Sequence, residues 1–278
     1  MYKKVLIFFV SSVVLIFVLY SIDIKEYIKL PESLITKKTT DNNDTSKKEV
    51  TPSVTKIDKN VEKQKNYLLG KFEPSQNNTF VLIPNSNIYL RKEAYQAFEK
   101  MREKAKLDNV NLSIVSGLRN FDYQKNIWEN KWNGKTLVEG KNLKETIPDE
   151  LERAKTILQY SSIPGTSRHH WGTDMDINST DPTYFDSAKG KKEYNWLVKN
   201  ASNFGFCQPY NEKTELNNRT GYSEEKWHWS YATLSRDLLK KYSSIIKISD
   251  ISGFSGDKYT QELNLIQDYV LGVNKSCL

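Results

Sequence analysis

Apolar residues recur at intervals of three and four along much of the chain after residue 88, and this spacing predicts amphipathic helices. Residues 89–106 show it clearly, with Ala94, Phe98, Met101 and Ala105 on one face. Together with the turn residues that separate the periodic segments, the pattern predicts helices at 89–106, 122–132, 148–160, 192–204, 232–242 and 261–271.

Shorter stretches between these helices have the composition of strands. Residues 111–115 alternate polar and apolar side chains before a Ser-Gly pair, and residues 175–177 and 227–231 are further candidates. Helices and strands follow one another in no regular order, and the chain shows no internal repeat. We therefore expect an α+β fold in which a small, mainly antiparallel sheet is flanked by helices.

The start of the chain has the pattern of a membrane helix. Two lysines precede residues 5–22, an apolar run interrupted only by serines. As a helix it would rise about 27 Å and cross the hydrocarbon of a bilayer. The charges that follow are mixed in sign, so the lysines orient the N-terminus toward the cytoplasm. A cleaved signal peptide is the alternative, but the run is long and no Ala-x-Ala follows it, which favours an uncleaved anchor.

Residues 31–66 are rich in Lys, Thr, Asp, Asn and Ser, a composition that cannot bury enough apolar surface to offset backbone ordering. The expected organisation is therefore a cytoplasmic tip at 1–4, a membrane anchor at 5–22, a flexible linker at 23–66 and one folded domain at 67–278. The domain would lie on the exported side of the membrane.

Charge and cysteine content bear on two further classes of function, nucleic-acid binding and cysteine-based metal or redox sites. Residues 67–278 carry 29 basic and 26 acidic side chains, a net charge of +3, so we expect no nucleic-acid partner. The two cysteines, Cys207 and Cys277, are too few for a disulfide framework and lack metal-binding spacing. In an oxidising compartment they could pair, or they could remain two separate thiols. Nothing in the sequence indicates an oligomeric state.

All three histidines fall in two short motifs, Ser167-Arg-His-His-Trp-Gly-Thr-Asp-Met-Asp176 and Glu225-Lys-Trp-His-Trp-Ser-Tyr231. A catalytic zinc site takes three protein ligands and leaves one position for water, and Zn²⁺ accepts imidazole nitrogen and carboxylate oxygen together. His169, Asp176 and His228 supply such a set. Glu225, three residues before His228, is then the expected general base.

These motifs resemble the VanY-like D-alanyl-D-alanine carboxypeptidases and their relatives, the LAS group of zinc peptidases. The family pattern is Ser-x-His, two residues, Gly, three residues, Asp, followed later by Glu-x-Trp-His, and both halves occur here in order. An upstream family element is similar to the segment Ser116-Gly-Leu-Arg119 with Gln124. The resemblance covers about residues 89–242.

The resemblance implies the LAS/VanY-like peptidase fold, Zn²⁺ as cofactor and peptidoglycan stem peptides as substrate. Together with the anchor, it implies a domain on the periplasmic side of a bacterial inner membrane. It implies that His169, Asp176 and His228 bind the metal, that Glu225 is the base and that Arg119 binds or polarises the substrate. Apart from the resemblance, an arginine is suited to bind the terminal carboxylate of a substrate, because its guanidinium can form two parallel hydrogen bonds with a carboxylate. Further substrate contacts are expected from Ser116, Gln124, Ser167 and Trp227.

Some neighbouring residues have open roles. Leu118 stands where the family has an aromatic residue and Asp174 where it has a small one, which bears on substrate preference. Asp174 could orient a ligand histidine, or it could have a solvated or capping role. His170 is an alternative ligand with a less suitable spacing. Trp171, Trp227 and Trp229 are more typical of core or pocket wall than of a sugar-stacking platform.

Several rival functions share parts of this pattern. An L,D-carboxypeptidase, a D-Ala-D-Ala dipeptidase or a peptidoglycan endopeptidase would use the same metal residues. A serine acyl enzyme needs Ser-x-x-Lys, which occurs at 53–56 and 244–247, but without its companion motifs. A non-catalytic wall-binding module would not need Glu225. Residues 245–278 lie outside the resemblance, and we expect them to pack as a C-terminal helix.

Overall fold

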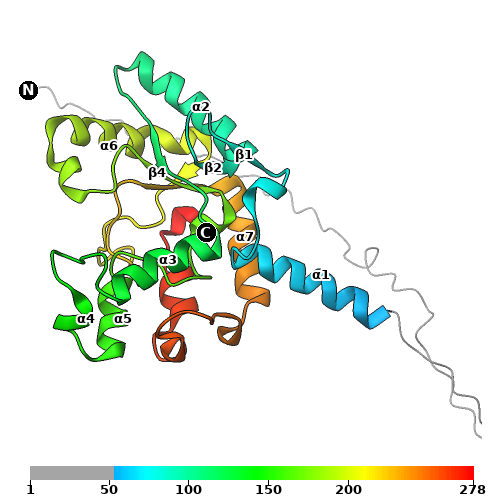
Figure 1. The fold of residues 1–278 in the computed structure, drawn as a ribbon. Coiled ribbons are helices and arrows are strands. Elements are labelled where there is room, and N and C mark those ends of the chain that lie inside the picture. The colour runs from blue at the N-terminus through cyan, green and yellow to red at the C-terminus, as the bar shows by residue number, and fades with distance from the viewer. Residues whose placement is uncertain (1–52) are drawn as a thin grey trace, which may run out of the picture. The chain divides into compact units, whose positions relative to one another are not determined.

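The computed structural model describes residues 53–278 (Figure 1). The predicted membrane helix at 5–22 and the linker up to residue 52 lie outside the described residues, so those predictions stay predictions. Within residues 53–278, none of the helices combines the length and apolar character needed to cross a bilayer.

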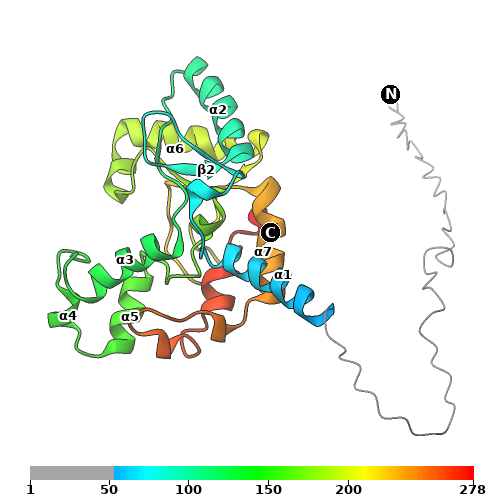
Figure 2. The same cartoon turned by 45° about the vertical axis from the view of Figure 1, so that its right-hand side comes forward.

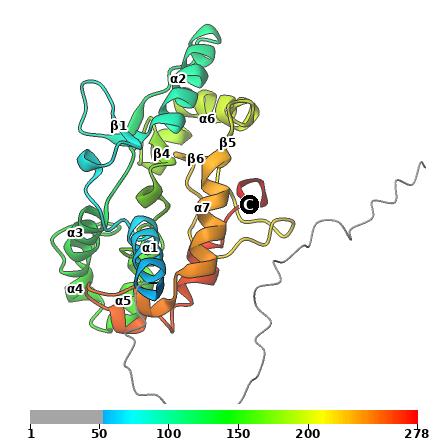
Figure 3. The same ribbon diagram turned by 90° about the vertical axis from the view of Figure 1, so that its right-hand side faces the viewer.

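The last part of the predicted linker is helical. Helix α1 (Ser53–Leu68) lies beside α7 (Ala232–Ile245), as Figure 3 shows. Its C-terminal end is fixed to the domain: Lys65 pairs with Asp250 at 2.8 Å and Leu68 is fully buried. The prediction of a flexible linker as far as residue 66 is therefore wrong from Ser53 onward. The ion pair of Lys65 and the burial of Leu68 hold one end of a helix that is otherwise polar.

A four-stranded antiparallel sheet forms the centre of the domain, in the order β3-β4-β6-β5. Its two inner strands are those that carry the second half of each histidine motif. The strands are β3 (Ile114–Ser116), β4 (Asp174–Ile177), β5 (Phe206–Cys207) and β6 (His228–Tyr231), and a separate hairpin pairs β1 (Phe80–Leu82) with β2 (Tyr89–Arg91). The expected mixed fold with a small antiparallel sheet is confirmed.

Helices pack in two groups around this sheet (Figures 1 and 2). One group, α2 (Lys92–Leu107) and α6 (Ala188–Asn200), buries Phe98, Met101 and Leu197 against Met175 and Trp229 of the inner strands. The other group builds a second core with the C-terminal segment. It consists of α3 (Phe121–Trp132), α4 (Leu143–Thr146), α5 (Glu150–Leu158), α1 and α7.

The remaining helical elements are single turns. Seven are 3-10 turns and one, Ile266–Val270, is a π turn. They are η3 (Pro74–Gln76), η4 (Arg168–Trp171), η5 (Pro182–Asp186), η6 (Ala201–Phe204), η7 (Ile248–Asp250), η8 (Asp257–Tyr259), η9 (Ile266–Val270) and η10 (Lys275–Cys277).

The C-terminal segment differs most from expectation. The helix predicted at 261–271 is reduced to the turn Ile266–Val270, because Asn264 takes a left-handed conformation with φ of +48° and interrupts it. Leu265 and Val270 are nevertheless fully buried. The apolar spacing therefore predicted the burial of these side chains correctly, although the backbone of this segment is mostly not helical.

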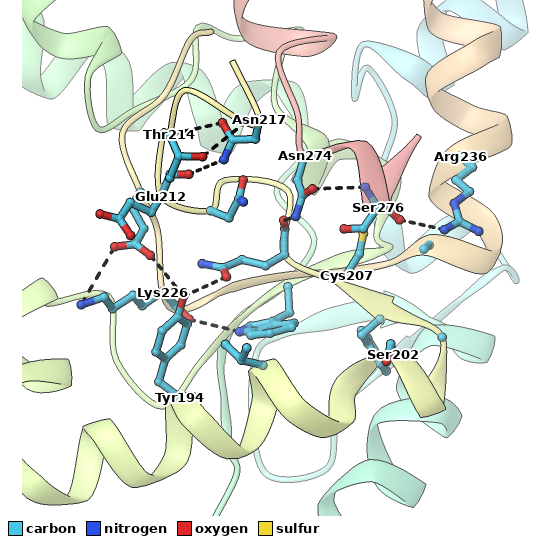
Figure 4. Close-up of a pocket in the computed structure, with 18 of the residues that line it drawn as sticks. Tyr194, Ser202, Cys207, Glu212, Thr214, Asn217, Lys226, Arg236, Asn274 and Ser276 are labelled. Atoms are coloured by element: carbon cyan, nitrogen blue, oxygen red, sulfur yellow. Dashed lines mark hydrogen bonds and ion pairs between the residues drawn. The ribbon is translucent and has the colours of Figure 1, made fainter. Parts of the chain in front are cut away.

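The end of the chain is fastened to edge strand β5. Cys207 and Cys277 form a disulfide, which settles the alternative left open by the sequence. Figure 4 shows the neighbouring contacts: Arg236 donates to the Ser276 carbonyl at 2.7 Å, and Asn274 donates to the Gln208 carbonyl at 3.2 Å. Gln208 in turn donates through Nε2 to the Glu225 carbonyl at 3.1 Å. The C-terminal segment thus braces the loop that carries Glu225.

Candidate active site

Strand register places the polar residues of the two motifs on one face of the sheet. Asp176 lies directly opposite His228 across the β4–β6 pair and opposite Ser116 across the β3–β4 pair. Because side chains alternate along a strand, Met175 and Trp229 point the other way, into the apolar core. Two neighbouring strands therefore present an imidazole and a carboxylate side by side.

His169 reaches the same place from the turn η4. The turn ends at Gly172, whose φ is +68°, and a Cβ atom there would stand 2.7 Å from the Phe80 ring. Only glycine fits both the backbone conformation and this close approach. The reversal leads straight into β4 and brings His169 Nε2 to 3.4 Å from Asp176 Oδ1.

Three potential ligand atoms converge at this point. One atom from each of His169, Asp176 and His228 lies within 4.8 Å of the other two. His228 Nδ1 is 3.6 Å from Asp176 Oδ1, and the three residues are at most 3% exposed. His169 Nε2 and Asp176 Oδ1 are buried without a hydrogen-bond partner. Buried polar atoms are normally satisfied, so two orphaned atoms facing one point fit a site that binds a cation.

Both imidazoles are oriented by a hydrogen bond on their far nitrogen. His169 Nδ1 donates to the Gly117 carbonyl at 2.7 Å, which leaves Nε2 to face the cluster. His228 Nε2 donates to Asp174 Oδ2 at 2.9 Å, which turns Nδ1 toward the cluster. Such partners fix the tautomer and ring plane of metal-binding histidines. Of the two roles considered for Asp174, orientation of a histidine is the one that the geometry supports.

Asp174 belongs to a fully buried charge network. Arg168 donates from Nε to Asp174 Oδ2 at 2.8 Å and from Nη2 to Ser230 Oγ at 2.7 Å. Ser230 and Thr173 both donate to Asp174 Oδ1. Arg168 and Asp174 are both 0% exposed, so each is the counter-charge of the other. The sequence motif contains this arginine, but its spacing gave no sign that it would pair with Asp174.

Electrostatic effects in the cluster favour ionised carboxylates. Burial alone would raise the pKa of Asp176, but His169 and Arg119 hold it well below its usual range. The pKa of Asp174 is likewise depressed, because Arg168 outweighs burial. Burial lowers the pKa of His169. In His228 hydrogen bonds to Asp174 and Glu225 outweigh burial and raise the pKa to about 9, so a proton and a metal ion would compete for Nδ1.

Glu225 and Arg119 flank the cluster. Glu225 Oε2 lies 3.1 Å from His228 Nδ1, within reach of the point that the three ligand atoms face. Arg119 Nη2 lies 3.3 Å from Asp176 Oδ2, and its Nε is buried without a partner. A carboxylate that can take a proton and a guanidinium with unused donors therefore stand on either side of the candidate metal position.

The cluster opens into a cleft of about 730 Å³. Ser116 and Trp227, which are expected to contact substrate, line it together with Arg119 and Glu225. Lys131 and Tyr210 line it as well, although neither lies in one of the motifs quoted above. Tyr210 precedes the second histidine motif by 15 residues, and its ring centroid lies 4.8 Å from that of His228.

Two residues expected to touch substrate do not line the cleft. Gln124 is fully buried and donates from Nε2 to the Ser162 carbonyl at 2.8 Å, so it supports the cleft wall at Ser162. Ser167 is 2% exposed, and its carbonyl accepts from the His170 amide at the start of η4. Both residues lie behind the cleft wall. Other residues of helix α3 and turn η4 line the cleft itself.

The remaining motif residues are structural. His170 accepts from the Gly165 amide at Nε2 and donates from Nδ1 to the Arg119 carbonyl at 2.6 Å, so neither nitrogen is available to a metal. Burial lowers the pKa of His170 to about 3. Trp171 and Trp229 are 0% and 3% exposed and belong to the cores, as expected.

A larger cavity of about 1030 Å³ lies elsewhere, beside β5 and α6 (Figure 4). None of the predicted site residues lines it. Many of its polar side chains bond to neighbours within the fold: Tyr194 donates to Gln208 at 3.0 Å, and Asn217 donates to the Glu212 carbonyl. The smaller cleft, with its orphaned metal-type donors, is therefore the better candidate for chemistry.

Comparison with known proteins identifies the family of the chain. The model of the VanY family, described as D-alanyl-D-alanine carboxypeptidase, matches residues 87–234, just over half of the chain. The carboxypeptidase-like protein YodJ of Bacillus subtilis is 30% identical over 204 residues, which cover 68% of this chain and 63% of YodJ. A D-alanyl-D-alanine carboxypeptidase of Enterococcus faecalis is 33% identical over 130 residues, 46% of this chain and 43% of that protein.

The chain thus matches less than two thirds of the length of either relative. Among solved structures, the D,D-pentapeptidase VanY from the VanB-type resistance cassette, crystallised with Zn(II), superposes with a TM-score of 0.43. Its sequence identity is 24%, and the match covers 62% of this chain and 88% of that one. The family match spans both histidine motifs, Arg119 and Glu225, and on that match the chain belongs to the VanY family of D-alanyl-D-alanine carboxypeptidases.

Proposed function

We propose that this protein is a zinc-dependent carboxypeptidase that removes C-terminal D-alanine from peptidoglycan stem peptides. The observation that carries the proposal is the convergence of His169, Asp176 and His228, with two of the ligand atoms buried and unpartnered. Two imidazoles and one carboxylate are a donor set that suits Zn²⁺, and three protein ligands leave room for water, as in catalytic zinc sites.

The donor set fits the metal in its details. Each imidazole is held by a far-side hydrogen bond, so His169 would bind through Nε2 and His228 through Nδ1. Asp176 would bind through Oδ1, since Oδ2 faces Arg119. When bound, zinc supplies a Lewis acid that polarises a carbonyl oxygen and lowers the pKa of a water molecule toward about 7.

The residues around the metal position have complementary tasks in hydrolysis. Glu225 takes a proton from the attacking water on Oε2 and later delivers it to the amine nitrogen of the leaving residue, as the carbon–nitrogen bond breaks. Arg119 directs its free donors toward negative charge that develops on the scissile carbonyl oxygen. No side chain is required to form a covalent bond to the substrate.

The rival readings have less support in the described residues. Ser244 and Lys247, one of the two Ser-x-x-Lys strings, are exposed and do not line the cleft, and the other string falls in α1. A wall-binding module would have no use for Glu225 placed beside a ligand histidine. L,D-carboxypeptidase, dipeptidase and endopeptidase activities share every metal residue, and the products of the reaction distinguish them.

We also propose that the domain works outside the cytoplasm of a bacterium, held at the inner membrane by residues 5–22. The Cys207–Cys277 disulfide supports export, because disulfides persist mainly in oxidising compartments. The stem peptides of peptidoglycan are found on that side of the membrane.

Digestion of defined stem peptides tests the proposed function. Zinc-loaded protein is expected to release one D-alanine from a pentapeptide that ends in D-Ala-D-Ala, and mass spectrometry identifies the product. Removal of the metal with a chelator should abolish the release, and added zinc should restore it, because polarised water is the nucleophile. Loss of a dipeptide, or of the last residue of a tetrapeptide only, would replace the proposed specificity; unchanged release in chelator would exclude a metallopeptidase.

A further inference from the structure

Two cationic side chains other than histidine line the cleft, and they have different partners. Arg119 lies 3.3 Å from Asp176, so it faces the metal position. Lys131, in the last turn of α3, hydrogen-bonds to the hydroxyl of Ser161. Among residues 59–278, whose side chains the structure describes, no carboxylate lies within 4.0 Å of the Lys131 ammonium, whereas Lys65 has Asp250 at 2.8 Å. Lys131 is therefore a cleft cation without a counter-ion.

The surroundings of Lys131 make this arrangement costly. Burial lowers the pKa of Lys131, the positive charge of Arg119 lowers it further, and Glu225 acts in the opposite sense. A partly buried ammonium next to a second cation is stabilised when an anion arrives. The cleft is open to solvent and lined on this side by Ser161 and Ser162, whose hydroxyls suit an anionic ligand.

We propose that Lys131 binds the C-terminal carboxylate of the substrate and so restricts the enzyme to peptides with a free end. The inference rests on the proposed function and deepens it. The two cations have different neighbours. Arg119 is held at Asp176 and serves the reacting carbonyl, while Lys131 offers a separate charge at the Ser161 wall of the cleft. Discrimination against an internal peptide bond then arises because an endopeptidase substrate carries no carboxylate at that position.

The alternative is that Lys131 only supports the wall of the cleft through Ser161. The two roles differ in one observable. A supporting lysine affects all substrates equally, whereas a carboxylate-binding lysine affects only those that end in a free carboxylate. Peptides that differ in that group alone therefore separate the roles.

The experiment compares three versions of one stem pentapeptide: a free C-terminal carboxylate, a C-terminal amide, and a free C-terminus with its side-chain carboxylates amidated. With zinc-loaded wild type we expect both free-ended peptides to be cleaved much faster than the amide. Lys131→Met should raise KM for the free-ended peptides and lower their kcat/KM by about 30-fold or more, as for truncation of one member of a buried charge pair. Its kcat/KM for the amide should stay within about threefold of wild type, because no pair is lost there.

Matched variants guard against a trivial loss of structure. Lys131→Arg keeps the charge and should retain most of the preference for a free end. Lys125→Met removes a lysine from the same helix but outside the cleft and should leave all three rates unchanged. Thermal unfolding and zinc content are measured for each variant.

The outcomes are distinct. An equal loss on acid and amide, no loss at all, or a preference that follows the side-chain carboxylates would each overturn the role of Lys131. Failure of wild type to cleave any of the peptides with zinc present would instead count against the proposed function.

Discussion

Replacing Glu225 by glutamine is expected to lower kcat by about 10²- to 10⁴-fold while zinc stays bound. Glutamine has nearly the same shape as glutamate but cannot accept a proton from water. The carboxylate stands 3.1 Å from His228 Nδ1 and is not needed to complete the set of three ligands. Steady-state kinetics on the free-ended pentapeptide, together with zinc analysis of the same preparation, measures both halves of the prediction.

Glu224 provides the matched control, because it is the neighbouring glutamate with a different environment. It accepts a hydrogen bond from Tyr194 at 3.1 Å and lines the other cavity. Glu224→Gln should therefore hydrolyse the peptide at nearly the wild-type rate. Wild-type kcat in zinc-loaded Glu225→Gln would show that some other group carries the proton, and loss of zinc from that variant would make Glu225 a ligand.

Replacing Asp174 by alanine, the small type of residue expected there in the family, should destabilise the domain by about 3–5 kcal/mol. The reason is that Arg168 would remain buried with its charge unpaired, since both side chains are 0% exposed. Zinc affinity should fall about 10- to 100-fold in the same variant, because His228 loses the partner that orients it. Chemical denaturation and competition with a zinc indicator give the two values.

The double variant Arg168→Met, Asp174→Ala separates the two effects. Removing both charges should recover most of the lost stability, because replacing a whole buried ion pair is often neutral. Zinc affinity should stay low, because His228 still lacks its acceptor. A stability loss below about 1 kcal/mol in Asp174→Ala, or a double variant no more stable than the single one, would contradict the proposed pairing.

The candidate site was predictable to the extent that it follows from short-range rules. The concentration of histidine in two motifs pointed to His169 and His228, and strand alternation puts Asp176 opposite His228 once the register is known. Helices α2, α3 and α7 were predicted within a few residues, because their apolar spacing is regular. These features depend on residues that are close in the chain or on one repeating period.

The rest depends on contacts between distant segments. Lys131 was not anticipated, because it enters the cleft only through the way α3 packs beside the Ser161 loop. Gln124 points toward the core for the same reason. Composition did not predict helix α1, because a few contacts at one end of the helix stabilise it, such as that of Lys65 with Asp250. No sequence rule determines which cysteines pair, so the Cys207–Cys277 disulfide follows only from the three-dimensional structure.

The most direct test of the metal centre is zinc stoichiometry combined with X-ray absorption at the zinc edge, on wild type and on His169→Ala, Asp176→Ala and His228→Ala. We predict one zinc per wild-type chain, bound by two imidazole nitrogens and by oxygen ligands, with zinc content falling to near zero in each variant although the fold persists. Zinc that remains bound at one per chain in folded His169→Ala or His228→Ala, or a wild-type spectrum without imidazole scattering, would contradict the claim that these three side chains hold a single ion.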